Sequence, residues 1–328
     1  MRKFSYFDAH CDTIYRCMMD SGETALCFGA NSEEQQKFFA DCTCLRQNNG
    51  HIDLQRTGSF SRYAQFFALF AHKKAGQSQL WSTCCRLYQR YLDELAQNRD
   101  RIVHCTTSAD IAAAAAEGKC AALLSIEGAD LLDCELSRIE TVASWGVRLL
   151  NPVWNDANVL CGTNYEDTDR GLSQKGRDFI RELETNRIYT DVSHMSDAGF
   201  WDLIRIAKRP VIASHSNARA LCPHSRNLTD DMFRAIRDCG GVVGINYYRP
   251  FVGNGGSMDA LIAHIEHFLS LDGEKTVCLG GDMDGCEELA GGMQGLQDVP
   301  KLYDELKQRG YSDALLEDIF WNNLERLL

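Results

Sequence analysis

The chain alternates between short apolar runs and longer segments in which apolar residues recur at three- and four-residue steps. The short runs are typical of buried strands, and the longer period is typical of helices that bury one face. The sequence predicts strands at residues 4–9, 63–70, 120–126, 146–152, 187–192, 210–214, 241–246 and 276–279. It predicts helices at residues 77–98, 109–117, 174–184, 197–207, 230–239 and 258–269, followed by two helices within 298–328.

Strands separated by helices predict a parallel sheet, and these eight strands are enough to close a (β/α)₈ TIM barrel. Residues 20–50 show no clear period and predict a long excursion between core elements. The composition shows no break that would require a second domain. We therefore expect residues 1–328 to form a single barrel domain with a C-terminal helical extension.

Composition narrows the possible partners and compartments. A net charge of −12 argues against a nucleic acid or an anionic membrane as the main partner, and no apolar run approaches a membrane span. The N-terminus has no export pattern, and the fifteen cysteines of so long a chain are interpreted as free thiols rather than as a disulfide framework or a zinc knuckle. The expected location is the cytoplasm.

Polar residues with metal-binding chemistry follow five of the predicted strands. They are His10, Asp12, Glu127, His194, His215 and Asp282. Because the C-terminal ends of barrel strands share one rim, residues far apart in sequence can converge there. Six unrelated solvated side chains are the alternative interpretation, but three imidazoles and three carboxylates suit two divalent cations such as zinc. The pattern favours a barrel of the metal-dependent hydrolase type.

Asp282 lies in Gly280–Gly285, where an apolar strand turns into two carboxylates flanked by glycines. Gly and Asp are ordinary turn residues, so the stretch alone also fits a solvated turn. Beside a metal centre, Asp282 could take a proton from a water held between two ions and return it to the leaving group. Asp284 is interpreted as a loop carboxylate that supports the site indirectly.

Glu127, on a central strand, is the natural carboxylate to bridge two ions, and the bridging hydroxide would be the nucleophile. This chemistry favours hydrolysis of an amide or ester. Hydrolysis of a phosphate ester is the alternative, and more basic residues around the rim would be expected for it.

Six motifs, in order along nearly the whole chain, carry a resemblance to a known family. They are His10-x-Asp12, Ile126-Glu127-Gly128, Asp191-Val192-Ser193-His194, Ser214-His215-Ser216, Ser225-Arg226-Asn227 and Gly280-Gly281-Asp282-x-Asp284-Gly285. Together they resemble the membrane (renal) dipeptidase family, peptidase family M19, of the amidohydrolase-like superfamily.

The resemblance implies a zinc-dependent dipeptidase with two Zn²⁺ per chain, and it suggests a homodimer. By motif position, His10 and Asp12 match ligands of one zinc, and His194 and His215 match ligands of the other. Glu127 matches the bridging ligand. Asp282 matches the catalytic acid/base that also contacts the substrate, and Arg226 matches the arginine that binds the carboxylate of a small dipeptide substrate.

Two features depart from the family. Trp154 stands where mammalian members carry a histidine that contacts the scissile carbonyl oxygen, and an indole cannot carry a proton to it. Asn155 or His224 could supply the missing donor. No lipid-anchor signal is evident, so membrane attachment is not expected. Two alternative functions stay open: an amidohydrolase acting on another small N-acyl or cyclic amide, and a metal-binding protein without catalytic activity.

Overall fold

The computed structural model describes residues 3–19, 44–72 and 79–328. Most of the excursion expected at residues 20–50, and the first two residues of the helix expected at 77–98, lie outside these ranges. Within them, no helix is both long and apolar enough to cross a membrane.

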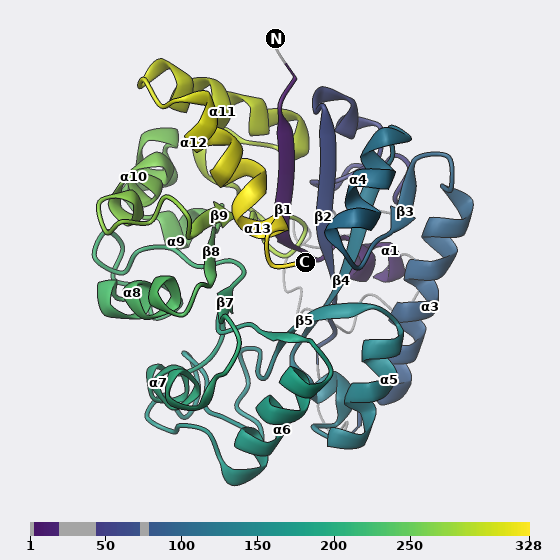
Figure 1. Cartoon of the computed structure of the whole chain (residues 1–328), viewed down its shortest axis with the longest axis vertical. Helices are drawn as coiled ribbons and strands as arrows, with labels where there is room; N and C mark the ends of the chain where they lie inside the picture. The colour runs from purple at the N-terminus through teal and green to yellow at the C-terminus, as the bar shows by residue number, and fades with distance from the viewer. Residues whose placement is uncertain (1–2, 20–43, 73–78) are drawn as a thin grey trace.

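Parallel strands form a barrel surrounded by helices (Figure 1). The strands are β1 (Ser5–Cys11), β2 (Arg62–Leu69), β3 (Ile102–His104), β4 (Cys120–Glu127), β5 (Val147–Asn151), β6 (Tyr189–Thr190), β7 (Ile212–Ala213), β8 (Val242–Ile245) and β9 (Val277–Leu279). Their order is β6-β5-β4-β2-β1-β9-β8-β7. A single bridge between Asp191 and Ile212 joins the ends of this order, and Val192 N donates to Ile212 O at 2.8 Å. The (β/α)₈ expectation is confirmed.

The observed strands differ from the predicted ones in two ways. β3 was not predicted; it pairs only with β4 outside the barrel path, and just one of its three residues is buried, so it leaves no periodic signal. β6 and β7 contain two residues each, far fewer than predicted. Neighbouring apolar residues, such as Ile188 before β6 and Val211 before β7, are buried but lie outside the ladder.

Helices follow most of the strands and cover the outside of the barrel (Figure 1). The main ones are α1 (Thr13–Met19), α3 (Trp81–Gln97), α4 (Ser108–Ala116), α5 (Ile139–Ser144), α6 (Gln174–Thr185), α7 (Asp197–Ile206), α8 (Asp230–Asp238), α9 (Arg249–Val252), α10 (Met258–Leu269), α11 (Val299–Gln308), α12 (Asp313–Glu317) and α13 (Asn323–Glu325). Thr229 caps α8, because its side chain accepts from Met232 N at 3.2 Å.

The C-terminal helices cover the end of the barrel where the strands begin. Ser5, at the start of β1, donates to Glu317 at 2.8 Å, and Asn323 donates to the carbonyl of Val277, at the start of β9, at 2.7 Å. The Trp321 ring packs on Phe7 with the centroids 5.5 Å apart, within a buried cluster to which all eight barrel strands contribute. This end is therefore closed, and the opposite rim carries the site.

Candidate metal centre and substrate cavity

A bulge in β1 directs His10 toward the barrel axis. Opposite β2, Asp8 pairs with Gln65 and Cys11 pairs with Phe67, so one extra residue lies between them on β1. Strict alternation would put Phe7 and Cys11 on one face, yet Phe7 lies in the interior cluster and Cys11 in the outer one. The bulge changes the phase, as bulges beside active sites commonly do.

All six residues predicted from strand ends are brought together at the C-terminal rim. His10 and Glu127 are in the last two residues of β1 and β4, while Asp12, His194, His215 and Asp282 follow their strands in the adjoining loops. Ligand-type atoms of five of them form two overlapping groups, each within 4.8 Å: His10 with Glu127 and His215, and His10 with Asp12 and Asp282. All of these residues are buried.

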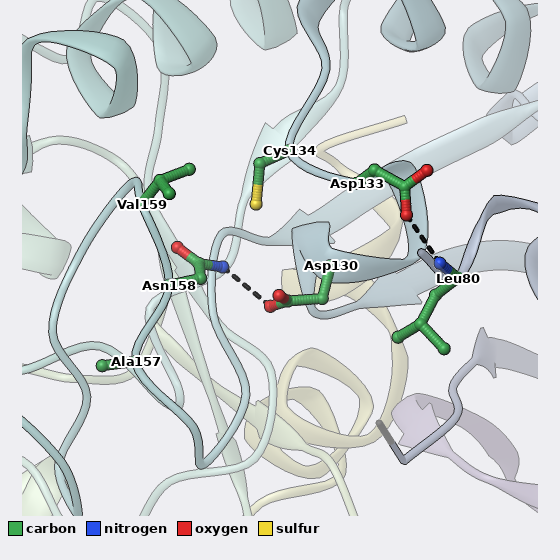
Figure 2. Close-up of a pocket in the computed structure, with 7 residues that line it drawn as sticks. All are labelled: Leu80, Asp130, Asp133, Cys134, Ala157, Asn158 and Val159. Atoms are coloured by element: carbon green, nitrogen blue, oxygen red, sulfur yellow. Dashed lines mark hydrogen bonds between the residues drawn. The ribbon is translucent and has the colours of Figure 1, made fainter. Parts of the chain in front are cut away.

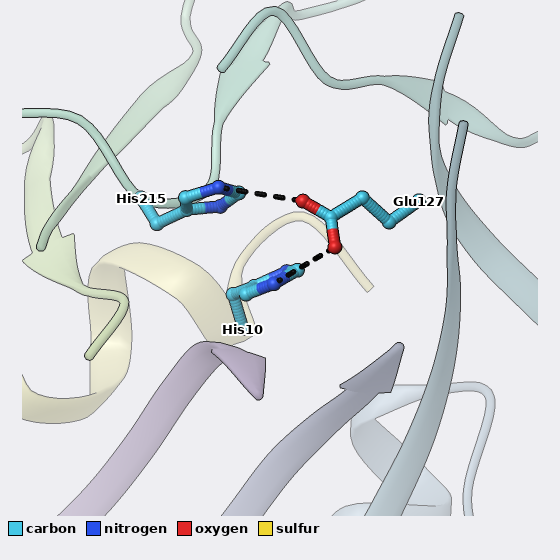
Figure 3. A group of neighbouring side chains, drawn as sticks. All are labelled: His10, Glu127 and His215. Carbon is cyan, nitrogen blue, oxygen red and sulfur yellow. Dashed lines mark ion pairs between the residues drawn. The ribbon is translucent and has the colours of Figure 1, made fainter. Parts of the chain in front are cut away.

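Glu127 lies at the centre of the cluster, with its two oxygens facing different histidines (Figure 3). Its Oε2 is 3.5 Å from Nε2 of His10, whereas its Oε1 is 2.8 Å from Nε2 of His194 and 3.6 Å from Nε2 of His215. Nε2 of His10 is also 3.3 Å from Oδ2 of Asp12. One carboxylate therefore connects the β1 part of the cluster to the part formed after β6 and β7.

Polar side chains orient the two histidines that follow β6 and β7. Nδ1 of His194 is 3.0 Å from Oδ1 of Asn155, and Nδ1 of His215 is 2.7 Å from Oγ of Ser214. Ser214 in turn donates to Asp191, a buried carboxylate that also accepts from the backbone of β7's loop. With Nδ1 engaged, each ring presents Nε2 to the centre, the arrangement found around metal-bound histidines.

The electrostatics fit a bound cation. Burial raises the pKa of Glu127 to about 7, and burial holds the pKa values of His194 and His215 well below the usual histidine range. Burial would lower the pKa of His10 too, but Glu127 and Asp12 outweigh it and raise that pKa well above the usual range. The carboxylates thus hold an extra positive charge at this point, which a metal ion could supply in place of the proton.

Two unsatisfied atoms support the same conclusion. Among the described residues, Nε2 of His10 and Oδ1 of Asp12 are buried and make no hydrogen bond. Leaving a polar atom buried without a partner is costly, and a metal ion would satisfy both atoms. The side chains present therefore fit a metal centre of nitrogen and oxygen ligands.

Asp282 occupies a turn that brings it beside this cluster. Its Oδ1 is 3.9 Å from Nε2 of His10, and its Oδ2 accepts from Nδ2 of Asn246 at 3.0 Å. Burial raises the pKa of Asp282 to about 6. The side chain thus faces both the proposed ligands and the cavity beside them.

Sequence reasoning missed Asp8, which ties the ends of β1 and β9 together. It is fully buried and accepts from the backbone N–H of His10 at 2.9 Å and of Gly281 at 3.0 Å. Gln65 adds a side-chain hydrogen bond at 3.2 Å. The available signal was an acid inside the apolar run Phe4–Ala9, where an unpaired carboxylate would be costly.

A cavity of about 280 Å³ opens beside the cluster, and Arg226 forms part of its wall. Arg226 is 3% exposed. Its Nη1 donates to the carbonyl of Ser193, and its Nη2 lies 2.9 Å from Nε2 of His194. In the described part of the chain, no carboxylate lies within ion-pair distance of this guanidinium. A buried, unpaired arginine facing a cavity suits an anionic group of a ligand.

Trp154 lines the same cavity, together with His72, which sequence reasoning missed. The two rings meet edge-on with centroids 4.4 Å apart, and Phe70 packs on Trp154 at 4.9 Å. Asn155 also lines the cavity, while Nδ1 of His224 accepts from the backbone of Arg226 at 3.1 Å. His72 follows β2 as the other site residues follow their strands, and that position was the available signal.

A second cavity, of about 380 Å³, lies outside the cluster and is lined by seven residues (Figure 2). Its wall includes Asp130 and Asp133, but both carboxylates are engaged: Asn158 donates to Asp130 at 2.8 Å, and Asp133 accepts from Leu80 N at 2.6 Å and from Arg138. Its side chains form no ligand-type cluster comparable to that around Glu127 within the described ranges.

A parallel (β/α)₈ barrel with buried histidines and carboxylates at its C-terminal rim, beside a cavity, defines a metal-dependent hydrolase.

Comparison with known proteins agrees with this class and specifies the family. The model of the membrane dipeptidase family (peptidase family M19) matches residues 1–328. An uncharacterized protein of the pqqA 5′ region of Klebsiella pneumoniae is 37% identical over 249 residues, which cover 71% of this chain and 90% of that protein. Dipeptidase tcpJ of Claviceps purpurea is 28% identical over 296 residues, covering 85% of this chain and 69% of that protein.

A solved structure extends the similarity to the whole fold. The metallo peptidase of Rhodobacter sphaeroides, determined with a phosphinate mimic of the dipeptide L-Ala-D-Ala, superposes with a TM-score of 0.83 at 25% identity and covers 99% of each chain. The chain belongs to the membrane dipeptidase family, peptidase family M19. It is a metallo-dipeptidase.

Proposed function

We propose that this metallo-dipeptidase works with two zinc ions, one held by His10 and Asp12, the other by His194 and His215, with Glu127 shared between them. The observation that carries the proposal is the placement of Glu127, whose Oε2 faces His10 while its Oε1 faces His194 and His215. Imidazole and carboxylate ligands suit zinc. When bound, two such ions polarise the substrate carbonyl and lower the pKa of a water.

Asp282 is proposed as the acid/base of the reaction. Its carboxylate lines the cavity beside the ligand cluster, and Asn246 orients it through Oδ2. The free Oδ1 can accept the proton of the attacking water and then deliver it to the leaving amine. Because burial favours the neutral form, the carboxylate can hold that proton between the two steps.

Arg226 is proposed to bind the free carboxylate of the dipeptide. A planar guanidinium can hold a carboxylate through two parallel hydrogen bonds. Here the buried side chain lines the cavity and its partners are a carbonyl and an imidazole. The dipeptide mimic bound by the Rhodobacter sphaeroides metallo peptidase supports a ligand of this class.

A phosphate ester is a poorer fit. Arg226 is the one arginine or lysine among the described residues that line the cavity, whereas Asp12, Glu127, Asp282 and Glu287 also line it. A dianionic phosphate would face these carboxylates. Hydrolysis of a phosphate ester, the alternative left open by the sequence, is therefore not favoured.

A second candidate is hydrolysis of another small N-acyl or cyclic amide, and Trp154 is the observation that favours it. Its indole, with Phe70 and His72, makes one wall of the cavity aromatic. Such a wall suits an apolar acyl group or ring. Replacing Arg226 by Lys or Ala separates the candidates, because loss confined to substrates with a free carboxylate supports the dipeptide.

We also propose that residues 1–328 act as one domain in the cytoplasm. The C-terminal helices contact the starts of β1 and β9, which supports one folding unit. The thirteen described cysteines are all free thiols, as expected in a reducing compartment.

The test is turnover of a panel of L-L and L-D dipeptides by zinc-loaded protein, with Asp282→Asn as the inactive comparison. Cleavage by the wild type, lost in the variant while its metal content is kept, supports the proposal. A wild type that holds two metals but cleaves no dipeptide would overturn the substrate assignment.

A further inference from the structure

Asp284 is buried and does not line the substrate cavity, yet it lies two residues from Asp282. We propose that Asp284 is a positioning residue that holds the turn carrying Asp282 against the end of β1, and so sets the distance between Asp282 and Asp12. The inference deepens the proposed function and rests on it for its kinetic readout.

Asp284 joins its own turn to two other segments through short hydrogen bonds. Its Oδ2 accepts from Oγ1 of Thr13 in α1 at 2.6 Å, and its Oδ1 accepts from the backbone N–H of His51 at 2.6 Å. Its own N–H donates to Nδ1 of His51 at 2.9 Å, and its carbonyl accepts from Nε of Arg16 at 2.6 Å. A solvated loop residue would not be fully buried among such partners.

The turn needs this support because its backbone is unfavourable. Both Asp282 and Asp284 adopt positive φ, at 55° and 65°. Such left-handed conformations cost energy for residues other than glycine, and they persist when the surroundings fix them. Asp284 provides these surroundings from α1 and from the segment around His51.

The turn also places two like charges together. Asp12 N donates to the carbonyl of Met283 at 3.0 Å, so the turn is attached to the residue proposed as a zinc ligand. A Cβ built on Gly285 would lie 2.2 Å from Oδ2 of Asp12 and 2.4 Å from Oδ1 of Asp282. Two carboxylates around such a small space repel each other at low dielectric. A fixed turn is needed to keep them there before a cation binds.

A simple structural role is the competing explanation. Thr13→Val distinguishes this explanation from the positioning role, because valine keeps the shape of the side chain and removes the hydroxyl that donates to Asp284. Thr13→Ser restores the hydroxyl. Asp284→Asn is the second variant: asparagine also tolerates the left-handed backbone but offers one acceptor oxygen instead of two. Gly58→Ala is the matched control, since no atom lies within 4 Å of a Cβ there.

Two measurements are made on each folded variant, well below its melting temperature. The first is zinc affinity, measured by competition with a chromophoric chelator. We expect the affinity of the weaker of two binding steps to fall by about 10- to 100-fold in Thr13→Val and Asp284→Asn. The same affinity should stay unchanged in Thr13→Ser and Gly58→Ala. The second is dipeptide turnover, where we expect kcat to fall by a similar factor with KM nearly constant.

Lower thermal stability with unchanged zinc affinity and kcat in both Thr13→Val and Asp284→Asn would overturn the inference, because it would show a structural role alone. If Thr13→Val does not fold, Asp284→Asn decides by the same criteria. If wild-type protein binds zinc but cleaves no dipeptide, the proposed function fails, and the zinc affinities still decide the role of Asp284.

Discussion

The two sides of the centre are held in different ways. On the imidazole side, formed by His194 and His215, polar side chains fix the rings: Asn155 and Ser214 each engage Nδ1. On the carboxylate side, formed by Asp12 and Asp282, the position is set mainly by backbone: a left-handed turn, an N–H to carbonyl bond and a glycine with no room for a methyl group.

The difference follows from the ligands. An imidazole has two distinct nitrogens, so its orientation depends on which one a neighbour occupies. A carboxylate has two equivalent oxygens and can rotate, so its position depends on where the backbone places it. Changes on the imidazole side should therefore act through hydrogen bonds to the rings, and changes on the carboxylate side through the position of the backbone that carries the carboxylates.

The largest effect is expected from Asp282→Asn, which removes the acid/base while preserving size. Asn can still accept from Nδ2 of Asn246 through its oxygen, so the turn should persist. We expect kcat to fall by about 10²- to 10⁴-fold, the usual range for loss of proton transfer, with metal content unchanged. A kcat within a factor of three of wild type would show that Asp282 does not transfer the proton.

Gly285→Ala should follow in size, because it tests steric fit on the carboxylate side. The new methyl group would meet oxygens of Asp12 and Asp282 at 2.2 Å and 2.4 Å, so both must move. Gly285 has no positive φ, so the backbone itself accepts alanine. We expect zinc affinity and kcat/KM to fall by about 100-fold, the upper end for a change beside the ligands. Wild-type zinc affinity in a folded Gly285→Ala protein would contradict the steric account.

Ser214→Ala addresses the imidazole side and should have a smaller effect. It removes the hydroxyl that lies 2.7 Å from Nδ1 of His215, leaving the ring without that partner. We expect zinc affinity to fall by about 10-fold. Ser216→Ala is the matched control two residues away, because the Ser216 hydroxyl has no hydrogen-bond partner among the described residues. Equal losses in both variants would show that the hydroxyl of Ser214 has no specific role.

The smallest effect on catalysis is expected from His51→Asn, which instead changes how stability depends on pH. Burial lowers the pKa of His51 to about 4; Asp284 opposes the shift, while Arg16 and Arg56 add to it. Between about pH 6.5 and 4 the unfolded chain takes up a proton at His51 that the folded chain does not, so stability falls as pH falls through this window.

From pH 7 to pH 5 this single group should cost about 2 kcal/mol of unfolding free energy. Asn can accept the Asp284 N–H through its oxygen but cannot titrate. Urea unfolding of the metal-free proteins at both pH values should therefore show that His51→Asn loses less unfolding free energy than the wild type between pH 7 and pH 5, and that the difference is the contribution of His51. An identical loss in the two proteins would contradict the low pKa of His51.

The sequence predicted those features that depend on regular periods and on strand ends. The barrel followed from eight apolar runs, and the six residues of the cluster followed from their positions just after those runs. β3 was not predicted, because three residues with one buried side chain show no hydrophobic period. Alternation also gives no warning of the bulge between Asp8 and Cys11 that turns His10 inward.

The supporting residues were harder to predict, because their partners are distant in sequence. Asp284 meets His51, 233 residues away, and Asp8 meets Gly281, 273 residues away. His72 follows β2, yet only the folded barrel brings its ring against Trp154. An acid in an apolar strand or a second acid in a glycine-rich turn shows that a partner is needed, but not which one.

The central claim is that Glu127 joins two metal ions, and counting the metals per chain tests it most directly. Zinc-loaded wild-type protein, freed of excess metal and analysed by inductively coupled plasma mass spectrometry, should contain two ions per chain, and Glu127→Gln should contain fewer at the same free zinc concentration. One ion per chain in the wild type, or two retained with unchanged affinity in Glu127→Gln, would contradict a centre bridged by this carboxylate.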